Sequence, residues 1–234
     1  MIQDYFQKSK SPFYSFIITL PIFLLYELGL FLMRGTEFSY IKNGADVLIE
    51  DMIATLGFDI FYISSSIFLL AFFIIAYYQK KNYDSFTIYK SYLSIMLFES
   101  FVYALLLFLL LGNMSLYLMD ISVQDIKFNI ILSLGAGIYE ELIFRVFSIF
   151  VLYKFISFIF KSMRHFSTQF FALLLSSILF SLFHFMGTES FSQEAFTIRF
   201  IAGILLGILY INRGFGITAI THSFYDIFVI FQLT

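Results

Sequence analysis

The sequence contains no cysteine and no tryptophan, and it has only two prolines and three histidines among its 234 residues. Without cysteine, the chain can form no disulfide, no thiolate metal site and no cysteine nucleophile. Charge is also scarce, because Asp, Glu, Lys and Arg make up 13% of the residues, whereas an average soluble domain has about 25%. The net charge of −2 comes without a basic run, which argues against nucleic acid as a partner.

Hydrophobic side chains take the place of the missing charge, at 60% of the chain, and aromatic residues contribute 22%. Because a helix needs about 20 apolar residues to cross a bilayer, the sequence predicts an all-α, polytopic transmembrane helical bundle. The expected spans are residues 12 to 33, 54 to 78, 91 to 112, 128 to 153, 167 to 187, 195 to 211 and 215 to 232. Residues 44–51 carry too many acids to cross and favour an interfacial helix. Seven spans are therefore expected, or eight if the chain crosses once more between residues 34 and 54.

The loops indicate how the bundle is oriented. Basic residues gather in alternate loops, at Lys8, Lys10, Lys80, Lys81, Lys90, Lys154, Lys161, Arg164 and Arg213, and the other loops hold Asp120, Asp125, Glu189 and Glu194. The positive-inside rule therefore places the N-terminus in the cytoplasm. The first apolar run has no small-residue cleavage site, so we expect a retained span rather than a signal peptide. The abundance of Ile, Phe and Lys is typical of an AT-rich bacterial genome, which makes the bacterial cytoplasmic membrane the expected location.

Three charged residues lie inside one of these spans. Glu140, Glu141 and Arg145 interrupt the apolar run GIYEELIFRVFSIFVLY. A charged residue at the centre of a membrane helix costs about 2.5 to 3.5 kcal/mol even on lenient scales, and such residues persist where they pair or line a polar cavity. Glu141 and Arg145, four positions apart, can neutralise each other on one helix face. Glu140 has no local cation and is the stronger candidate for chemistry.

Two further spans carry pairs of residues at the same spacing, and each pair includes a histidine. Phe180 with His184, and His222 with Asp226, are each four apart and share a helix face. A poorly hydrated carboxylate such as Glu140 suits a general base that takes a proton from water. A histidine supplies a second proton carrier or a donor to an oxyanion, and Asp226 can orient His222. Straight helices would place Glu140, His184 and His222 at unequal depths, so a shared site requires tilted or interrupted helices.

Together these segments form three short motifs in a fixed order: EELIFR at 140–145, FSLFH at 180–184 and THSFYD at 221–226. Their order and separation resemble the CAAX prenyl protease and bacteriocin-processing family (CPBP, or Abi) of intramembrane endopeptidases. The resemblance covers roughly residues 130 to 230. No long polar linker or fixed-period repeat divides the chain, so we expect one integral membrane domain over residues 1–234, with a protease-like core at 128–232.

The resemblance implies a role for each motif residue. Glu140 and His184 would activate the hydrolytic water, His222 and Asp226 would lie on the oxyanion side, and Glu141 with Arg145 would support them. Asp226 departs from members that have Asn here, because an aspartate donates a hydrogen bond only when it is protonated. The implied partners are membrane lipid and a protein or peptide substrate cleaved near the membrane surface, and no cofactor is expected.

Two alternatives stay open at this point. The first is a zinc-dependent membrane metalloprotease with Glu140, His184, His222 and Asp226 as ligands, although the chain lacks HExxH, and it also lacks the GxGD and GxS motifs of other intramembrane proteases. The second is a non-catalytic membrane scaffold or a transporter, although the halves show no inverted repeat. The remaining acids of the spans, Glu27, Asp59 and Glu99, belong to no motif, and we expect packing or cavity-lining roles for them.

Overall fold

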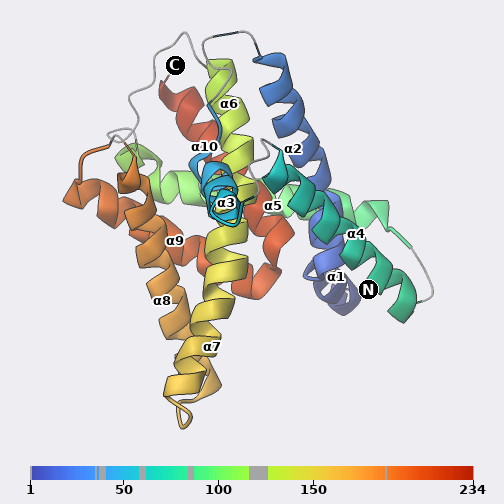
Figure 1. Cartoon of the computed structure of the whole chain (residues 1–234). Helices are drawn as coiled ribbons and strands as arrows, with labels where there is room; N and C mark the ends of the chain where they lie inside the picture. The colour runs from blue at the N-terminus through green and yellow to red at the C-terminus, as the bar shows by residue number, and fades with distance from the viewer. Residues whose placement is uncertain are drawn as a thin grey trace.

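The computed structural model describes residues 2–34, 36, 41–57, 62–83, 87–115, 126–187 and 189–233, and these residues form helices without a strand (Figure 1). This confirms the predicted helical bundle. The first half consists of α1 (Ile2–Ser9), α2 (Pro12–Leu32), α3 (Gly44–Ala54), α4 (Ile63–Tyr83) and α5 (Lys90–Ser115). The second half consists of α6 (Ile126–Gly135), the π-helical segments η3 (Ala136–Glu140) and η4 (Leu142–Ser148), α7 (Ile149–Ile159), α8 (His165–Phe183), the 3₁₀ turn η5 (His184–Met186), α9 (Gln193–Arg213) and α10 (Phe215–Leu233).

Six helices in the described part of the chain are long and apolar enough to cross a membrane. They are Pro12–Leu32, Ile63–Lys81, Lys90–Gly112, Ile126–Ile159, His165–Met186 and Gln193–Arg213. The seventh expected span, residues 215 to 232, does form a helix, α10, but it is not among the six. Its apolar character is diluted by polar residues such as Thr218, His222 and Asp226, and these face the protein interior or a pocket.

The segment between the first two spans differs from expectation at one boundary. Residues 44–51 do form a separate helix, α3, but it continues to Ala54, where the second span was expected to begin. The chain then turns at Gly57, whose φ of 91° suits glycine, and the span α4 starts at Ile63. Asp59, for which a packing role was expected, lies outside the described residues.

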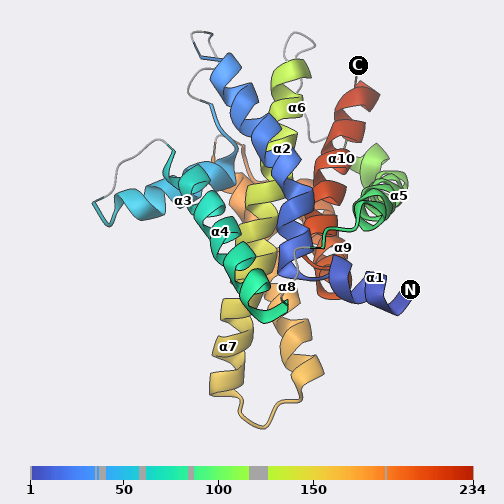
Figure 2. The ribbon, with the colours of Figure 1, turned by 90° about the vertical axis from the view of Figure 1, so that its right-hand side faces the viewer.

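Helix α10 is the central element of the bundle. It packs against α2, α5, α6, α9 and η3, and Figure 2 shows it running between α2 and α6 on one side and α5 on the other. The contact with η3 depends on Gly137, because a Cβ at that position would overlap Ser223 Oγ and the carbonyl oxygen of Ala219. This close approach brings the third motif, on α10, against the first motif, which begins on η3.

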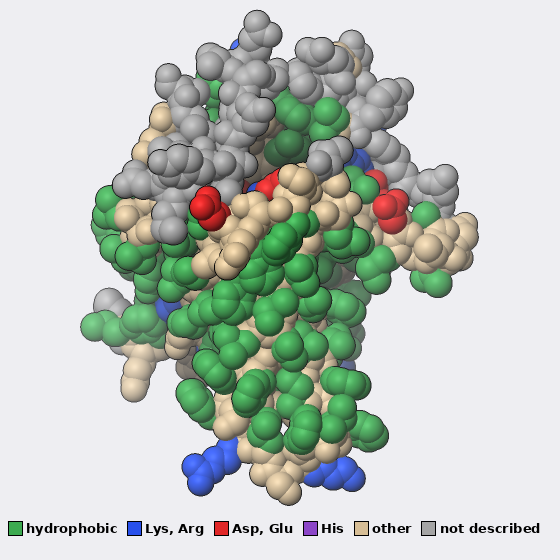
Figure 3. All heavy atoms as spheres, turned by 90° about the vertical axis from the view of Figure 1, so that its left-hand side faces the viewer, with side chains coloured by type: hydrophobic (Ala, Val, Ile, Leu, Met, Phe, Trp, Pro, Cys, Tyr) green, Lys and Arg blue, Asp and Glu red, His purple; other side chains and the backbone are tan. Residues whose placement is uncertain are grey.

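Helices α7 and α8 form a hairpin that extends below the rest of the molecule in Figure 2. Apolar side chains cover the face of this hairpin in Figure 3, and Lys and Arg side chains lie at its lower tip. The connection at that tip contains Lys161 and Arg164. An apolar surface that ends in basic residues is the pattern of a hairpin that crosses hydrocarbon and ends in the headgroup region.

The acids of the first and third spans, Glu27 and Glu99, accept hydrogen bonds from residues outside the three motifs. Glu99 accepts hydrogen bonds from the Arg213 guanidinium (Nε–Oε1 2.6 Å) and from Tyr5 Oη (2.6 Å), which ties α5 to α9 and α1. Glu27 accepts from Ser65 Oγ at 2.6 Å. These contacts agree with the packing roles expected from the sequence.

Candidate active site

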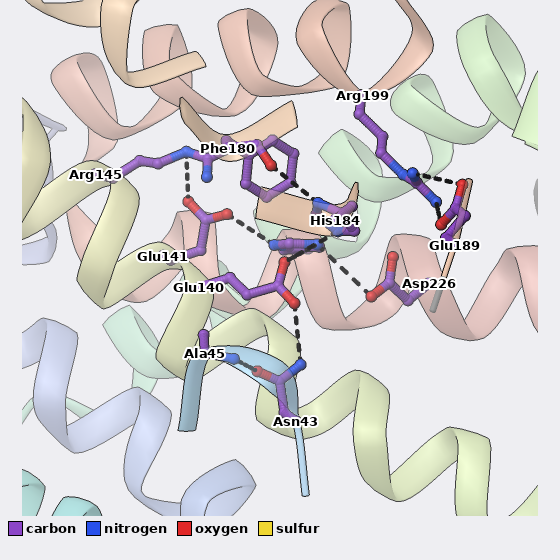
Figure 4. Close-up of polar contacts among 11 residues, drawn as sticks. Asn43, Ala45, Glu140, Glu141, Arg145, Phe180, His184, Glu189, Arg199 and Asp226 are labelled. Carbon is purple, nitrogen blue, oxygen red and sulfur yellow. Dashed lines mark hydrogen bonds and ion pairs between the residues drawn. The ribbon is translucent and has the colours of Figure 1, made fainter. Parts of the chain in front are cut away.

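The three motifs converge on one carboxylate. Glu140 Oε2 lies 3.9 Å from His184 Nε2 and 3.9 Å from His222 Nε2. Glu140 ends η3, His184 follows the last residue of α8, and His222 lies in α10, so each group comes from a different helical segment (Figure 4). Both distances are too long for a direct hydrogen bond and leave the three groups around a common point.

Interrupted helices explain how residues expected at unequal depths meet. Glu140 and Glu141 lie where two π-helical segments adjoin, between α6 and α7. A π-helix is wider than an α-helix and often marks a functional site. On the second motif, α8 ends at Phe183 and the chain tightens into η5 from His184 onward. The sequence indicated that such irregularity was needed and pointed to the helix ends near Gly187 and Gly214, but it did not indicate the π-helical segments around Glu140.

His184 is oriented by the first residue of its own motif. Its Nδ1 lies 2.9 Å from the carbonyl oxygen of Phe180. A carbonyl can only accept, so Nδ1 carries the proton of this hydrogen bond, and in the neutral ring Nε2 keeps its lone pair. That nitrogen is the one nearest Glu140. The FxxxH spacing therefore gives the tautomer of His184 in addition to its helix face.

His222 is held by the second acid of the first motif. Its Nδ1 lies 2.7 Å from Glu141 Oε1, whereas Asp226 Oδ2 lies 3.6 Å from its Nε2. Asp226 was expected to orient His222, and it is close by, but the shorter contact is with Glu141 across the helix interface. The Glu141 carboxylate accepts the proton on Nδ1, and Nε2 is the nitrogen of His222 that lies near Glu140, at 3.9 Å from Oε2.

Glu141 also forms the expected ion pair with Arg145, at 3.1 Å between Oε2 and Nε, and both side chains are fully buried. The terminal nitrogens of Arg145 make no hydrogen bond within the described structure. Instead, the guanidinium lies 4.3 Å from the centre of the Phe180 ring. A cation over an aromatic face is attracted by the ring quadrupole. Arg145 is therefore held by a cation–π contact with Phe180 on α8, the helix that leads into His184.

The site opens into a pocket of about 180 Å³ lined by Glu140, Phe180, His184, Arg199, His222 and Asp226, with apolar side chains of α9 and α10. The Asp226 side chain is 26% exposed, so it lies at the edge of the pocket. At the same edge, Arg199 donates two hydrogen bonds to Glu189, at 2.9 and 2.8 Å. This Arg199–Glu189 pair at the edge of the pocket, visible in Figure 4, was not predicted from the sequence.

Asn43 is a second residue that the sequence did not predict at the site. Its Nδ2 donates a hydrogen bond of 3.0 Å to Glu140 Oε1, although the two residues are 97 positions apart. The only local signal is an Asn directly before a helix, which is a preferred N-cap. That signal explains its place at the start of α3 but could not show that α3 would lie against η3.

The zinc alternative concerns the same side chains. Among the residues that the structure describes, no group of three His, Asp or Glu side chains is arranged to hold a metal ion. Glu140, His184, His222 and Asp226 offer the oxygen and nitrogen atoms that zinc accepts. The zinc reading therefore stays a prediction, to be tested by chelation.

Comparison with known protein families gives a match over the motif-bearing part of the chain. Residues 122–228 match the family described as type II CAAX prenyl endopeptidase Rce1-like. The searches of curated proteins and of solved structures each gave no match. The matched region includes all three motifs and the helices that bring them together. It confirms the resemblance predicted from those motifs: over residues 122–228, the chain is similar to the Rce1-like family of CAAX prenyl endopeptidases.

Proposed function

We propose that this integral membrane protein is an intramembrane endopeptidase in which Glu140 and His184 activate a water molecule for attack on a peptide bond. The observation that carries the proposal is the position of Glu140 Oε2, 3.9 Å from Nε2 of both His184 and His222. Polar groups at this separation are bridged well by a single water. A water held there contacts one carboxylate and two imidazole nitrogens.

The hydrolytic step follows from these positions. The water oxygen attacks the carbonyl carbon while Glu140 takes one of its protons, with His184 Nε2 as a second acceptor. The carbon–nitrogen bond then breaks, and the proton passes from Glu140 to the departing nitrogen. The products are a carboxylic acid and an amine, which become a carboxylate and an ammonium ion once they reach water, and the site returns to its starting protonation state. No side-chain nucleophile is needed, in keeping with the absence of cysteine.

His222 and Asp226 serve the carbonyl oxygen in this proposal. With Nδ1 donating to Glu141, a protonated His222 presents Nε2–H toward the pocket, where it stabilises the negative oxygen that forms during attack. Asp226, 3.6 Å from the same Nε2, favours the protonated ring. The aspartate thus acts through the imidazole, so it need not donate a hydrogen bond as the amide of an Asn would.

The proposal for Glu141 and Arg145 is positional. Glu141 fixes the ring of His222, and Arg145 balances the charge of Glu141 inside the bundle, where an unpaired carboxylate would be costly. Neither side chain lines the pocket. Their proposed contribution is the geometry of His222 rather than contact with the substrate.

We further propose a location and orientation for this activity. The substrate is a membrane-associated protein or peptide, the membrane is the bacterial cytoplasmic membrane, and the N-terminus lies in the cytoplasm. The basic tip of the α7–α8 hairpin supports this orientation, because Lys161 and Arg164 then lie on the cytoplasmic side. The domain assignment, residues 1–234 with a core at 128–232, stays a prediction.

The proposal can be tested without a known substrate. Membranes that contain the wild-type chain or Glu140→Gln are incubated, and new peptide termini are quantified by mass spectrometry. We expect termini that arise with the wild type and are absent with Glu140→Gln. Equal sets of termini from the two proteins would overturn the proposal.

A further inference from the structure

We propose that Asn43 is a positioning residue for Glu140: its carboxamide holds one carboxylate oxygen so that the other faces the two histidines. This inference rests on the proposed function, and it assigns a role in the site to a residue outside the matched region 122–228. The site would then be completed by the N-terminal half of the chain.

The two oxygens of Glu140 have different neighbours. Oε1 accepts the 3.0 Å hydrogen bond from Asn43 Nδ2, and Oε2 is the oxygen near His184 and His222. Asn43 and Glu140 are both buried. A hydrogen bond to one oxygen restricts rotation of the carboxylate, because turning it would leave both the amide and the carboxylate without this partner inside the protein.

The orientation of the Asn43 amide is itself fixed by helix α3. Its Oδ1 accepts a hydrogen bond from the backbone N–H of Ala45 at 2.9 Å, as an N-cap residue does. If the amide flipped, its oxygen would face the Glu140 carboxylate and its NH₂ would face a backbone donor. Capping of α3 therefore determines that the end of Asn43 that meets Glu140 is a donor (Figure 4).

A buried network holds the backbone of Asn43 in place. Its N–H donates to Tyr26 Oη at 3.1 Å, and Tyr26 Oη donates to Asp46 Oδ2 at 2.8 Å. Ser64 donates to the other oxygen of Asp46. Tyr26 and Asp46 are completely buried. This series of hydrogen bonds, which runs from Ser64 through Asp46, Tyr26 and Asn43 to Glu140, joins α4, α2 and the start of α3 to η3.

The test separates the contact with Glu140 from the capping of α3. Serine at position 43 can still cap the helix, but its side chain is too short to reach Glu140, whereas alanine loses both functions. Asn43→Asp keeps the cap and the shape of the side chain but replaces the amide donor with a second acid beside Glu140. We expect all three variants to produce Glu140-dependent termini about 10- to 100-fold more slowly, because a Glu140 carboxylate that can rotate is misplaced for attack and a small misplacement costs up to about 100-fold.

Thermal unfolding of the purified proteins in detergent provides the second measurement. If positioning is the role of Asn43, Asn43→Ser unfolds close to the wild-type temperature and is nevertheless slow, while Asn43→Ala is both slow and less stable. Wild-type cleavage by Asn43→Ser and Asn43→Asp, with Glu140→Gln inactive, would overturn this inference and leave the proposed function standing. Undiminished cleavage by Glu140→Gln would instead refute the proposed function and this inference with it.

Discussion

Glu141 Oε1 lies 2.7 Å from His222 Nδ1, a contact between residues 81 positions apart. It divides the two adjacent acids of the first motif between two tasks. Glu140 faces the pocket, and Glu141 turns away from it to hold the imidazole of the third motif. Arg145 contacts Glu141 in turn. Arg145, Glu141 and His222 therefore form a buried chain of side-chain contacts behind the site.

Arg145→Ala tests the energetic importance of this chain. The change leaves Glu141 as a buried carboxylate without its cation, which costs about 3 to 5 kcal/mol when a buried pair is broken. Thermal or denaturant unfolding of the purified protein measures this loss. The matched control is Arg199→Ala, which removes a partly exposed Arg–Glu pair and should cost no more than about 1 kcal/mol. Equal losses in the two variants would contradict the buried-chain assignment.

Gly137→Ala tests the close contact between η3 and α10. An alanine methyl group would overlap Ser223 and the backbone of Ala219, so α10 must move away and His222 must move with it. We expect a loss of cleavage of at least about 100-fold, since a small misplacement of a catalytic group can cost that much. Gly187→Ala is the control, because nothing lies within 4 Å of a Cβ there. Full activity of Gly137→Ala would show that this approach does not set the site.

Chelation distinguishes the proposed mechanism from a zinc enzyme. If Glu140 and His184 activate water without a metal, protein treated with EDTA and 1,10-phenanthroline and then freed of chelator produces the same termini at the same rate. Loss of activity that added Zn²⁺ restores would support the zinc alternative instead. Metal content measured on the treated and untreated protein shows whether the removal was complete.

The absence of cysteine allows a direct test of orientation. Lys161→Cys places a single thiol in the α7–α8 connection, and Glu194→Cys places one at the start of α9. With the N-terminus in the cytoplasm, a membrane-impermeant maleimide labels position 194 in intact spheroplasts and position 161 only in inverted vesicles. The opposite pattern would reverse the proposed orientation.

The sequence predicted the parts of the site that depend on spacing along one helix. Phe180 with His184, and Glu141 with Arg145, lie as the four-residue spacing requires, because these contacts are local. The contact of His222 with Glu141 rather than Asp226 could not be predicted, since it depends on how closely α10 approaches η3. Gly137 permits that approach, but a glycine alone does not identify the helix it will meet.

The same limit explains why Asn43 was missed. Its position before α3 indicates an N-cap, which is a local property, whereas its hydrogen bond to Glu140 depends on the packing of α3 against η3. The start of the second span at Ile63 rather than residue 54 has a similar origin. Residues 52–54 are apolar enough to belong to either helix, and the turn that separates α3 from α4 follows them.

The most direct measurement compares Glu140→Gln with Glu27→Gln in the assay of new peptide termini. Both changes remove an acid from a membrane helix and keep the shape of the side chain, but Glu27 contacts Ser65 and Tyr139 and does not line the pocket. We predict that Glu140→Gln slows cleavage by about 10²- to 10⁴-fold, the usual contribution of a general base, and that Glu27→Gln cleaves at nearly the wild-type rate. Cleavage by Glu140→Gln at the rate of Glu27→Gln would contradict the assignment of Glu140 as the group that activates water.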